Sequence, residues 1–102
     1  MSSPMSDMLS ALWTKSHDEI MARVTAIESA SLALRAGALD SALQLAAGRE
    51  AHKLAGVAGM FGYWEATDLA REAEDLLGGT SISDEGAHRI ATIASLLREQ
   101  LG

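Results

Sequence analysis

The chain has 102 residues, of which 48% are hydrophobic and 4% aromatic, and its formal net charge at pH 7 is -6. This length fits one domain over residues 1–102 that buries its own core, and the lack of cysteine excludes disulfides and thiolate metal sites. An acidic chain without a basic stripe is not expected to bind nucleic acid or anionic membranes.

Two further features suggest where the protein works. The N-terminus does not resemble a signal peptide, and no apolar run approaches the roughly 18 residues of a membrane span. We therefore expect a cytoplasmic protein with no membrane segment. Its many alanines and leucines favour a bundle of helices over a sheet.

The first predicted helix covers about residues 4–31 and ends before Gly37. A capping side chain or a first-turn proline places its start at Ser3-Pro4 or Ser6-Asp7. Apolar residues recur at three- and four-residue steps, which is typical of one buried helix face. The expected inward residues are Leu9, Leu12, Trp13, Ile20, Val24 and Ile27.

Three more helices are predicted over about residues 40–61, 64–77 and 84–101, with Asp40 as an N-cap and glycines after the second and third. The fourth opens on acidic residues, which suit the positive end of the helix dipole. Short connections make neighbouring helices antiparallel, so we expect an all-α, up-down four-helix bundle. The expected inward residues are Leu43, Ala47, Leu54, Ala58 and Phe61 in the second helix, Ala66, Leu69, Ala70, Ala73, Leu76 and Leu77 in the third, and Ile90, Ile93, Leu96, Leu97 and Leu101 in the fourth.

The stretch AHKLAGVAGMFG, residues 51–62, places glycines around a single histidine. With 3.6 residues per turn, Leu43 and Phe61 lie about 180° from His52, so His52 faces solvent if they face the core. Gly48, Gly56 and Gly59 all lie within about 40° of His52, where each costs the helix roughly 0.5–1 kcal/mol relative to alanine. The alternative is that these glycines permit tight helix packing, which would bury His52.

An exposed, unobstructed imidazole offers a nitrogen lone pair to an electrophile or a metal. A metal site needs other ligands, and the remaining histidines do not supply them. His17 is expected to be a solvated surface residue. Glu85 and His88 form one Glu-x-x-His step, whereas di-iron bundles need two. No metal site is therefore expected, and an access role for the glycines favours a nucleophile.

The residues Ala51, His52, Leu54, Gly56 and Gly62 resemble the signature of histidine-containing phosphotransfer (HPt) domains. The stretch ATDLAREAEDLL, residues 66–77, also resembles the next helix of that family. The resemblance covers the two central helices closely and the outer two only by pattern. It implies a four-helix bundle whose second helix carries a phosphoryl group on one histidine and exchanges it with the aspartate of receiver domains.

Carried over by position, the resemblance makes His52 the phospho-accepting residue, and Gly56 leaves room for the incoming aspartyl phosphate. The implied docking surface comprises Leu45, Gly48, Gly59, Met60 and Tyr63. Many family members also have a lysine three residues after the histidine, where this chain has Ala55. Either the phosphohistidine is held less firmly, or Lys53 or Arg49 supplies the missing charge. An antiparallel neighbouring helix brings Arg71, Glu72, Glu74 or Asp75 to the level of His52, and of these we expect Glu74 to orient the imidazole.

The resemblance implies a monomeric carrier whose partners are a response-regulator receiver domain, a hybrid histidine kinase, or both. No cofactor is expected on the chain, because magnesium belongs to the receiver, and without a P-loop the protein should not use ATP. It is thus not predicted to be an enzyme. The alternative is an unphosphorylated adaptor that regulates receivers or kinases by occupancy.

The sequence predicts the packing of some aromatic and acidic side chains and leaves that of others open. Trp13 and Phe61 are predicted to be in the core, whereas Tyr63 and Trp64 fit either a packed turn or a partner surface. The acidic residues between 65 and 75 are expected on a solvated face. Glu50 lies about 160° from His52, so it requires a rotated core or a basic partner, either Lys15 or Arg23.

Overall fold

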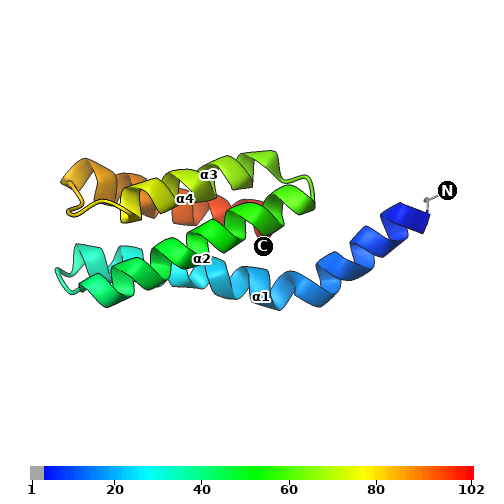
Figure 1. Cartoon of the computed structure of the whole chain (residues 1–102), viewed down its shortest axis with the longest axis horizontal. Coiled ribbons are helices and arrows are strands. Elements are labelled where there is room, and N and C mark those ends of the chain that lie inside the picture. Colours follow the sequence, from blue (N-terminus) through cyan, green and yellow to red (C-terminus); the bar gives the residue numbers. More distant parts are fainter. Residues whose placement is uncertain (1–3) are drawn as a thin grey trace.

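The computed structural model describes residues 4–102, with side chains from residue 7 onward. Four helices make up this part of the chain: α1 (Pro4–Arg35), α2 (Ser41–Met60), α3 (Trp64–Leu77) and α4 (Asp84–Leu101). They run alternately up and down, with α1 and α2 in one layer and α3 and α4 in the other (Figure 1). The predicted all-α, up-down four-helix bundle is therefore confirmed. No helix of the described part is long and apolar enough to cross a membrane.

The helix ends follow local sequence signals. The Asp40 carboxylate accepts a hydrogen bond from the Leu43 N–H at 2.8 Å, and the Ser83 hydroxyl accepts one from the Gly86 N–H at 3.0 Å. The ends of α1 and α2 are Schellman motifs with Gly37 and Gly62 at positive φ. Helix α1 therefore ends at Arg35, which lies between residue 31 and Gly37, where its end was expected. Ser3, one expected capping residue, lies outside the described residues.

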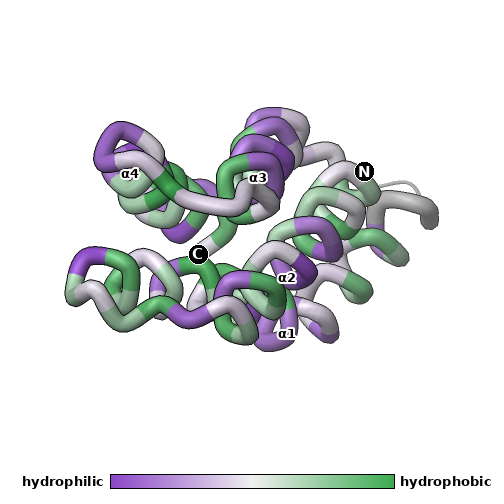
Figure 2. Tube along the Cα trace, turned by 60° about the vertical axis from the view of Figure 1, so that its left-hand side comes forward, coloured by the Kyte–Doolittle hydropathy of each residue, from purple (hydrophilic) through white to green (hydrophobic). Residues whose placement is uncertain are grey.

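The core is aliphatic and lies between all four helices. Hydrophilic and hydrophobic residues alternate along each helix, as Figure 2 shows, and the hydrophobic ones meet inside. The large side chains that are almost wholly buried are Ile20, Val24, Ile27, Leu54, Ile90, Ile93, Leu97 and Leu101. Helix α3 contributes mainly alanines, so it packs closely against its neighbours.

Three residues expected in the core are exposed. Leu9 and Leu12 lie on the part of α1 that projects beyond the bundle (Figure 1). A helix of 32 residues is about 48 Å long, whereas the neighbours of α1, helices α2 with 20 residues and α4 with 18, span only about 30 Å and 27 Å, so the start of α1 extends beyond them. Leu43 is 52% exposed, because the buried face of α2, centred near Ala51 and Ala58, is rotated about 40° from the predicted direction and away from Leu43.

The structure also corrects the prediction for His17. Its ring is partly buried, lies 5.6 Å from the ring of Trp13, and its Nε2 donates to the Leu101 carbonyl at 2.9 Å. His17 thus satisfies one of the free carbonyl groups at the end of α4. It is a link between α1 and α4 and not a solvated side chain.

Each contact between neighbouring helices includes one polar side-chain pair, which is an ion pair at three of the contacts and a histidine–carboxylate hydrogen bond at the fourth. Arg23 of α1 bonds Glu50 of α2 at 2.7 Å, which identifies the partner that Glu50 requires. The remaining pairs are His52 with Glu74 between α2 and α3, Arg89 with Glu72 between α3 and α4, and Arg98 with Glu28 between α1 and α4. The bonded guanidinium groups lower the pKa of both Glu72 and Glu28. Of the acidic residues expected on a solvated face, Glu65, Asp68 and Asp75 are exposed, whereas Glu72 is paired with Arg89. Glu74 is paired with His52, as expected.

The Glu72–Arg89 pair predicts an acid dependence of stability. Because the pKa of Glu72 is lower in the folded protein than its ordinary value of 4.5, the stabilisation is present above that value and is lost as the pH falls through the folded pKa. Glu72→Gln should lower the urea midpoint at neutral pH, and the difference from wild type should shrink in acid. Glu99→Gln, at an exposed position of α4, is the matched control. A difference that stays constant across this range would contradict the prediction.

Candidate functional site

His52 lies in the middle of α2 and its side chain is 72% exposed. Its neighbours Ala51 and Leu54 are fully buried, so the backbone that carries the imidazole is anchored in the core. The alternative in which the glycines bury His52 at a helix interface is therefore wrong. The ring stands on a rigid helix and faces solvent.

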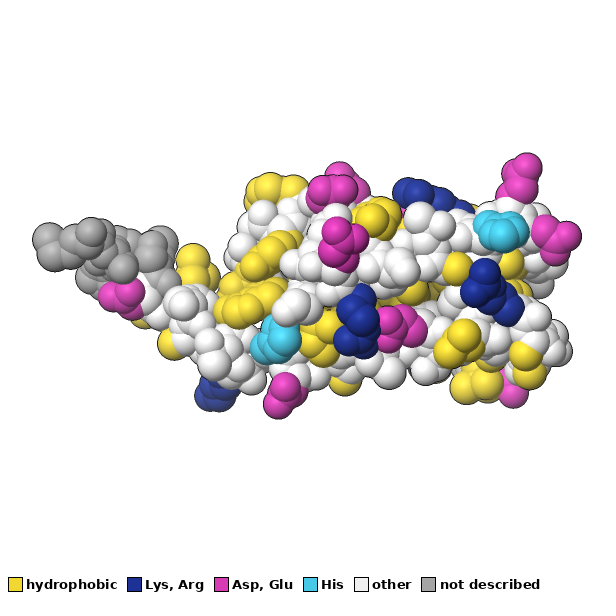
Figure 3. Space-filling view, turned by 180° about the vertical axis from the view of Figure 1, so that it is seen from behind, with side chains coloured by type: hydrophobic (Ala, Val, Ile, Leu, Met, Phe, Trp, Pro, Cys, Tyr) yellow, Lys and Arg dark blue, Asp and Glu magenta, His cyan; other side chains and the backbone are white. Residues whose placement is uncertain are grey.

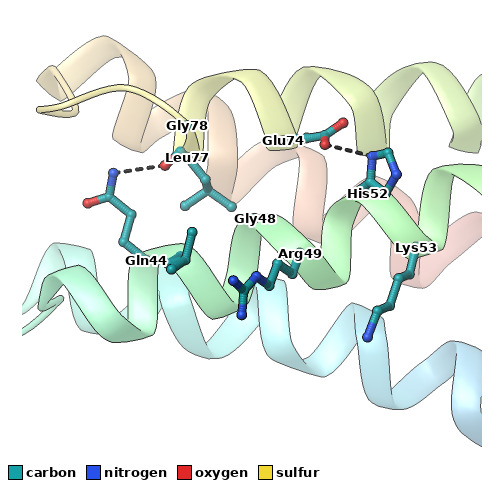
Figure 4. Close-up of a pocket in the computed structure, with 9 residues that line it drawn as sticks. Gln44, Gly48, Arg49, His52, Lys53, Glu74, Leu77 and Gly78 are labelled. Carbon is teal, nitrogen blue, oxygen red and sulfur yellow. Dashed lines mark hydrogen bonds and ion pairs between the residues drawn. The ribbon is translucent and has the colours of Figure 1, made fainter.

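Glu74 of α3 fixes the orientation of the ring. The Nδ1 atom of His52 lies 2.8 Å from the Glu74 Oε2 atom (Figure 4). An ionised carboxylate only accepts hydrogen bonds, so Nδ1 carries the proton and donates it. The lone pair of the neutral ring is then on Nε2, which is the nitrogen available to an electrophile. The predicted contact between Glu74 and His52 is present in the structure.

The three glycines near His52 differ in their surroundings. A Cβ atom added at Gly56 would have no neighbour within 4 Å. One at Gly59 would lie 3.2 Å from the Thr67 hydroxyl and 3.5 Å from Trp64, and one at Gly48 would lie 3.8 Å from the Leu77 Cβ. Gly56 thus leaves open space beside the imidazole, whereas Gly59 allows α3 to approach α2.

Two surface hollows flank His52. The first, which we call the Gly48 hollow, has a volume of about 300 Å³ and is drawn in Figure 4. Its lining residues are Gln44, Leu45, Gly48, Arg49, His52, Lys53, Glu74, Leu77 and Gly78. The second, the Gly56 hollow, has a volume of about 310 Å³ and is lined by His52, Ala55, Gly56, Arg71, Glu74 and Asp75. His52 and Glu74 form the wall between them.

The basic residues expected beside His52 point elsewhere. Lys53 extends away from the imidazole (Figure 4), and its Nζ lies 3.9 Å from the Glu50 Oε1 atom. Arg49 lines the Gly48 hollow, and its guanidinium also points away from His52 (Figure 4). In helical projection both lie about 60–100° from His52 on the side away from α3. This placement does not favour Lys53 or Arg49 as the source of the positive charge that a lysine at position 55 would supply.

The predicted docking residues fall into two groups. Leu45 and Gly48 line the hollow beside His52, whereas Met60 and Tyr63 are exposed at the end of the bundle from which α1 projects. Hydrophobic side chains gather at this end (Figure 3). There the ring of Trp13 stacks on Tyr63 with centroids 4.8 Å apart. Trp13 is thus partly buried, as expected for a packing residue.

Aromatic packing also accounts for the exposure of the residues at the turn between α2 and α3. Phe61 meets the edge of Trp13 at 5.2 Å and is partly buried. Trp64 is 68% exposed, so it presents a large apolar surface to solvent while Tyr63 is packed on one side. Between residues 7 and 102, no group of three or more histidine or acidic side chains converges on a possible metal position.

One residue lining the hollows beside His52, Gln44, escaped prediction as a site residue. The Gln44 amide donates to the carbonyl oxygens of Leu77 and Gly79, each at 2.8 Å, and so holds the end of α3 against α2. Arg71, which the sequence already placed near the level of His52, lines the Gly56 hollow. Its exact position relative to His52 depends on the register of α3 against α2, which the sequence alone does not specify.

The fold and the site define a class of protein, a four-helix bundle that displays one oriented, solvent-exposed imidazole. The family model of the Hpt domain matches residues 8–101, so the chain belongs to the Hpt domain family. Hpt domains are phosphotransfer modules of two-component phosphorelays and interact with receiver domains and histidine kinases. Searches among curated proteins and among solved structures gave no match to this chain.

The contrast between Gly56 and Gly59 can be measured as stability. Gly56→Ala should raise the free energy of unfolding by about 0.5–1 kcal/mol, because alanine favours the helix and its Cβ meets nothing. Gly59→Ala should gain nothing or destabilise, because its Cβ would press on Thr67, whose hydroxyl donates to the Ala55 carbonyl at 3.0 Å. Urea unfolding of both variants tests this, and equal gains would contradict it.

Proposed function

We propose that His52 is the phospho-accepting residue of this Hpt domain and exchanges a phosphoryl group with the aspartate of a receiver domain. The strongest support is that the two ring nitrogens of His52 have different surroundings. Nδ1 donates to Glu74, and Nε2 lies exposed beside the bare backbone of Gly56. A nucleophile whose electrophile arrives on another protein needs this combination of orientation and access.

The proposed transfer has a simple balance of bonds and charges. The Nε2 lone pair attacks the phosphorus of the aspartyl phosphate, the bond from phosphorus to the carboxylate oxygen breaks, and the aspartate leaves with that electron pair. Nδ1 keeps its proton, so the phosphorylated ring is positively charged and the Glu74 carboxylate stabilises it. The reverse reaction returns the phosphoryl group. Magnesium would be supplied by the receiver domain.

A direct assay for this function mixes the protein with a phosphorylated receiver domain and magnesium, without ATP. We expect an acid-labile, base-stable phosphate on His52, and none on His52→Gln. Gly56→Leu should keep its helix content, measured by circular dichroism, but fail to accept phosphate because the side chain fills the space beside the imidazole.

The same assay separates the carrier from the adaptor. Phosphate transfer to His52→Gln would show that the site is wrong. If wild type and His52→Gln bind receivers equally well and neither becomes phosphorylated, the protein is an adaptor that acts by occupancy. The intact and oriented imidazole favours the carrier.

Glu74 is proposed as a positioning residue. Glu74→Gln retains an oxygen that accepts from Nδ1 but loses the charge, and Glu74→Ala loses both, so transfer should fall by about tenfold or more, with alanine the worse. Nitrogen NMR of the ring should show a mixed tautomer in Glu74→Ala. Asp68→Asn, at an exposed site of the same helix, is the control. Unchanged tautomer and rate in Glu74→Ala would contradict this role.

A further inference from the structure

We infer that Arg71 of α3 binds the phosphoryl group on His52, and that this charge comes from α3 instead of α2. The inference rests on the proposed function, since it concerns the phosphorylated form of His52. The orientation of the His52 ring indicates where a phosphoryl group would lie. Nδ1 faces Glu74, and the other ring nitrogen points along α2 toward its C-terminal end (Figure 4). Gly56 lies one turn further in that direction.

The antiparallel arrangement brings Arg71 to the same place. Arg71 precedes Glu74 by three residues on α3, which is nearly one turn and about 4.5 Å along the axis. Because α3 runs opposite to α2, a step back along α3 is a step toward Gly56. Arg71 and Gly56 accordingly line the same hollow, together with the imidazole.

The negative charges that would meet in the Gly56 hollow favour a cation among its lining residues. A phosphoryl group on Nε2 brings about two negative charges into the Gly56 hollow, whose lining already includes the carboxylates of Glu74 and Asp75. Arg71 is the one basic residue among those lining the hollow. A guanidinium group presents several N–H donors in a plane and suits phosphate oxygens.

The other basic residues of the described chain do not line the Gly56 hollow, and Lys15 and Arg35 belong to α1. Arg23, Arg89 and Arg98 form ion pairs with glutamates between helices. Lys53 lies beside Glu50, and Arg49 lines the opposite hollow. Arg71 is exposed and has no ion pair with any residue from 7 to 102. It is therefore available to a group that arrives on His52.

Ala55 offers a way to test the source of this charge. It is 5% exposed but forms part of the wall of the Gly56 hollow, beside His52. A lysine at position 55 would send its ammonium into the same hollow from α2, since its long stem extends toward solvent. Ala55→Lys should then substitute for Arg71.

The decisive measurement is the equilibrium constant for phosphoryl exchange between a receiver aspartate and His52, with magnesium and without ATP. Arg71→Ala should shift it about tenfold toward the receiver, because one charge-assisted contact to the phosphoryl group is lost. Arg71→Lys should shift it less. Arg71→Ala combined with Ala55→Lys should return toward wild type. Arg35→Ala, which removes the same charge at the far end of α1, should have no effect.

An equilibrium constant does not depend on how tightly the two proteins dock, so a docking defect cannot imitate the expected shift. Loading with phosphoramidate, which needs no partner, separates the two hypotheses. If wild type takes up phosphate on His52 but Arg71→Ala has the wild-type equilibrium constant, the role of Arg71 is overturned and the proposed function stands. If neither phosphoramidate nor a phosphorylated receiver loads wild type, the proposed function fails and the inference fails with it.

Discussion

The close packing of α2 against α3 is the constraint on which the rest of the site depends. The axes of packed helices usually lie about 8–10 Å apart, and small side chains at the contact allow the lower value. Here the buried faces are made largely of alanine, and Gly59 leaves just enough room for Thr67. This contact is the most extensive between any two helices of the bundle. Across this contact the Glu74 carboxylate reaches the His52 imidazole directly, at 2.8 Å.

This packing explains why the glycines have different roles although they share one helix face. Gly59 lies toward α3, where a Cβ would press on Thr67, so it serves the approach of the two helices. A Cβ at Gly48 would be in ordinary contact with Leu77. Gly56 points into open space and contributes nothing to packing, so its cost in helix propensity has no structural return. The proposed access to the imidazole accounts for it.

The distribution of charge follows the same geometry. Polar side-chain pairs connect each helix to its neighbours, and the pair between α2 and α3 is the one that includes His52. The site thus occupies a position that elsewhere in the bundle is taken by an arginine–glutamate ion pair. It differs in that one partner is an imidazole with a second ring nitrogen. Arg71 remains outside this set of pairs and borders the space that the second nitrogen faces.

The sequence by itself determined the four helices, most of their ends and the exposed position of His52, because these depend on local periodicity, caps and glycines. Its family motif covers the site helix and indicated the phosphotransfer class. Only the tertiary structure decided the rotation of α2 that exposes Leu43, the projection of α1, and the pairing of Glu50 with Arg23. The register of α3 against α2 likewise placed Arg71, and not Lys53, in the lining of the Gly56 hollow that His52 borders. These features depend on how the faces of different helices pack together. The spacing of apolar residues along a single helix does not specify that packing.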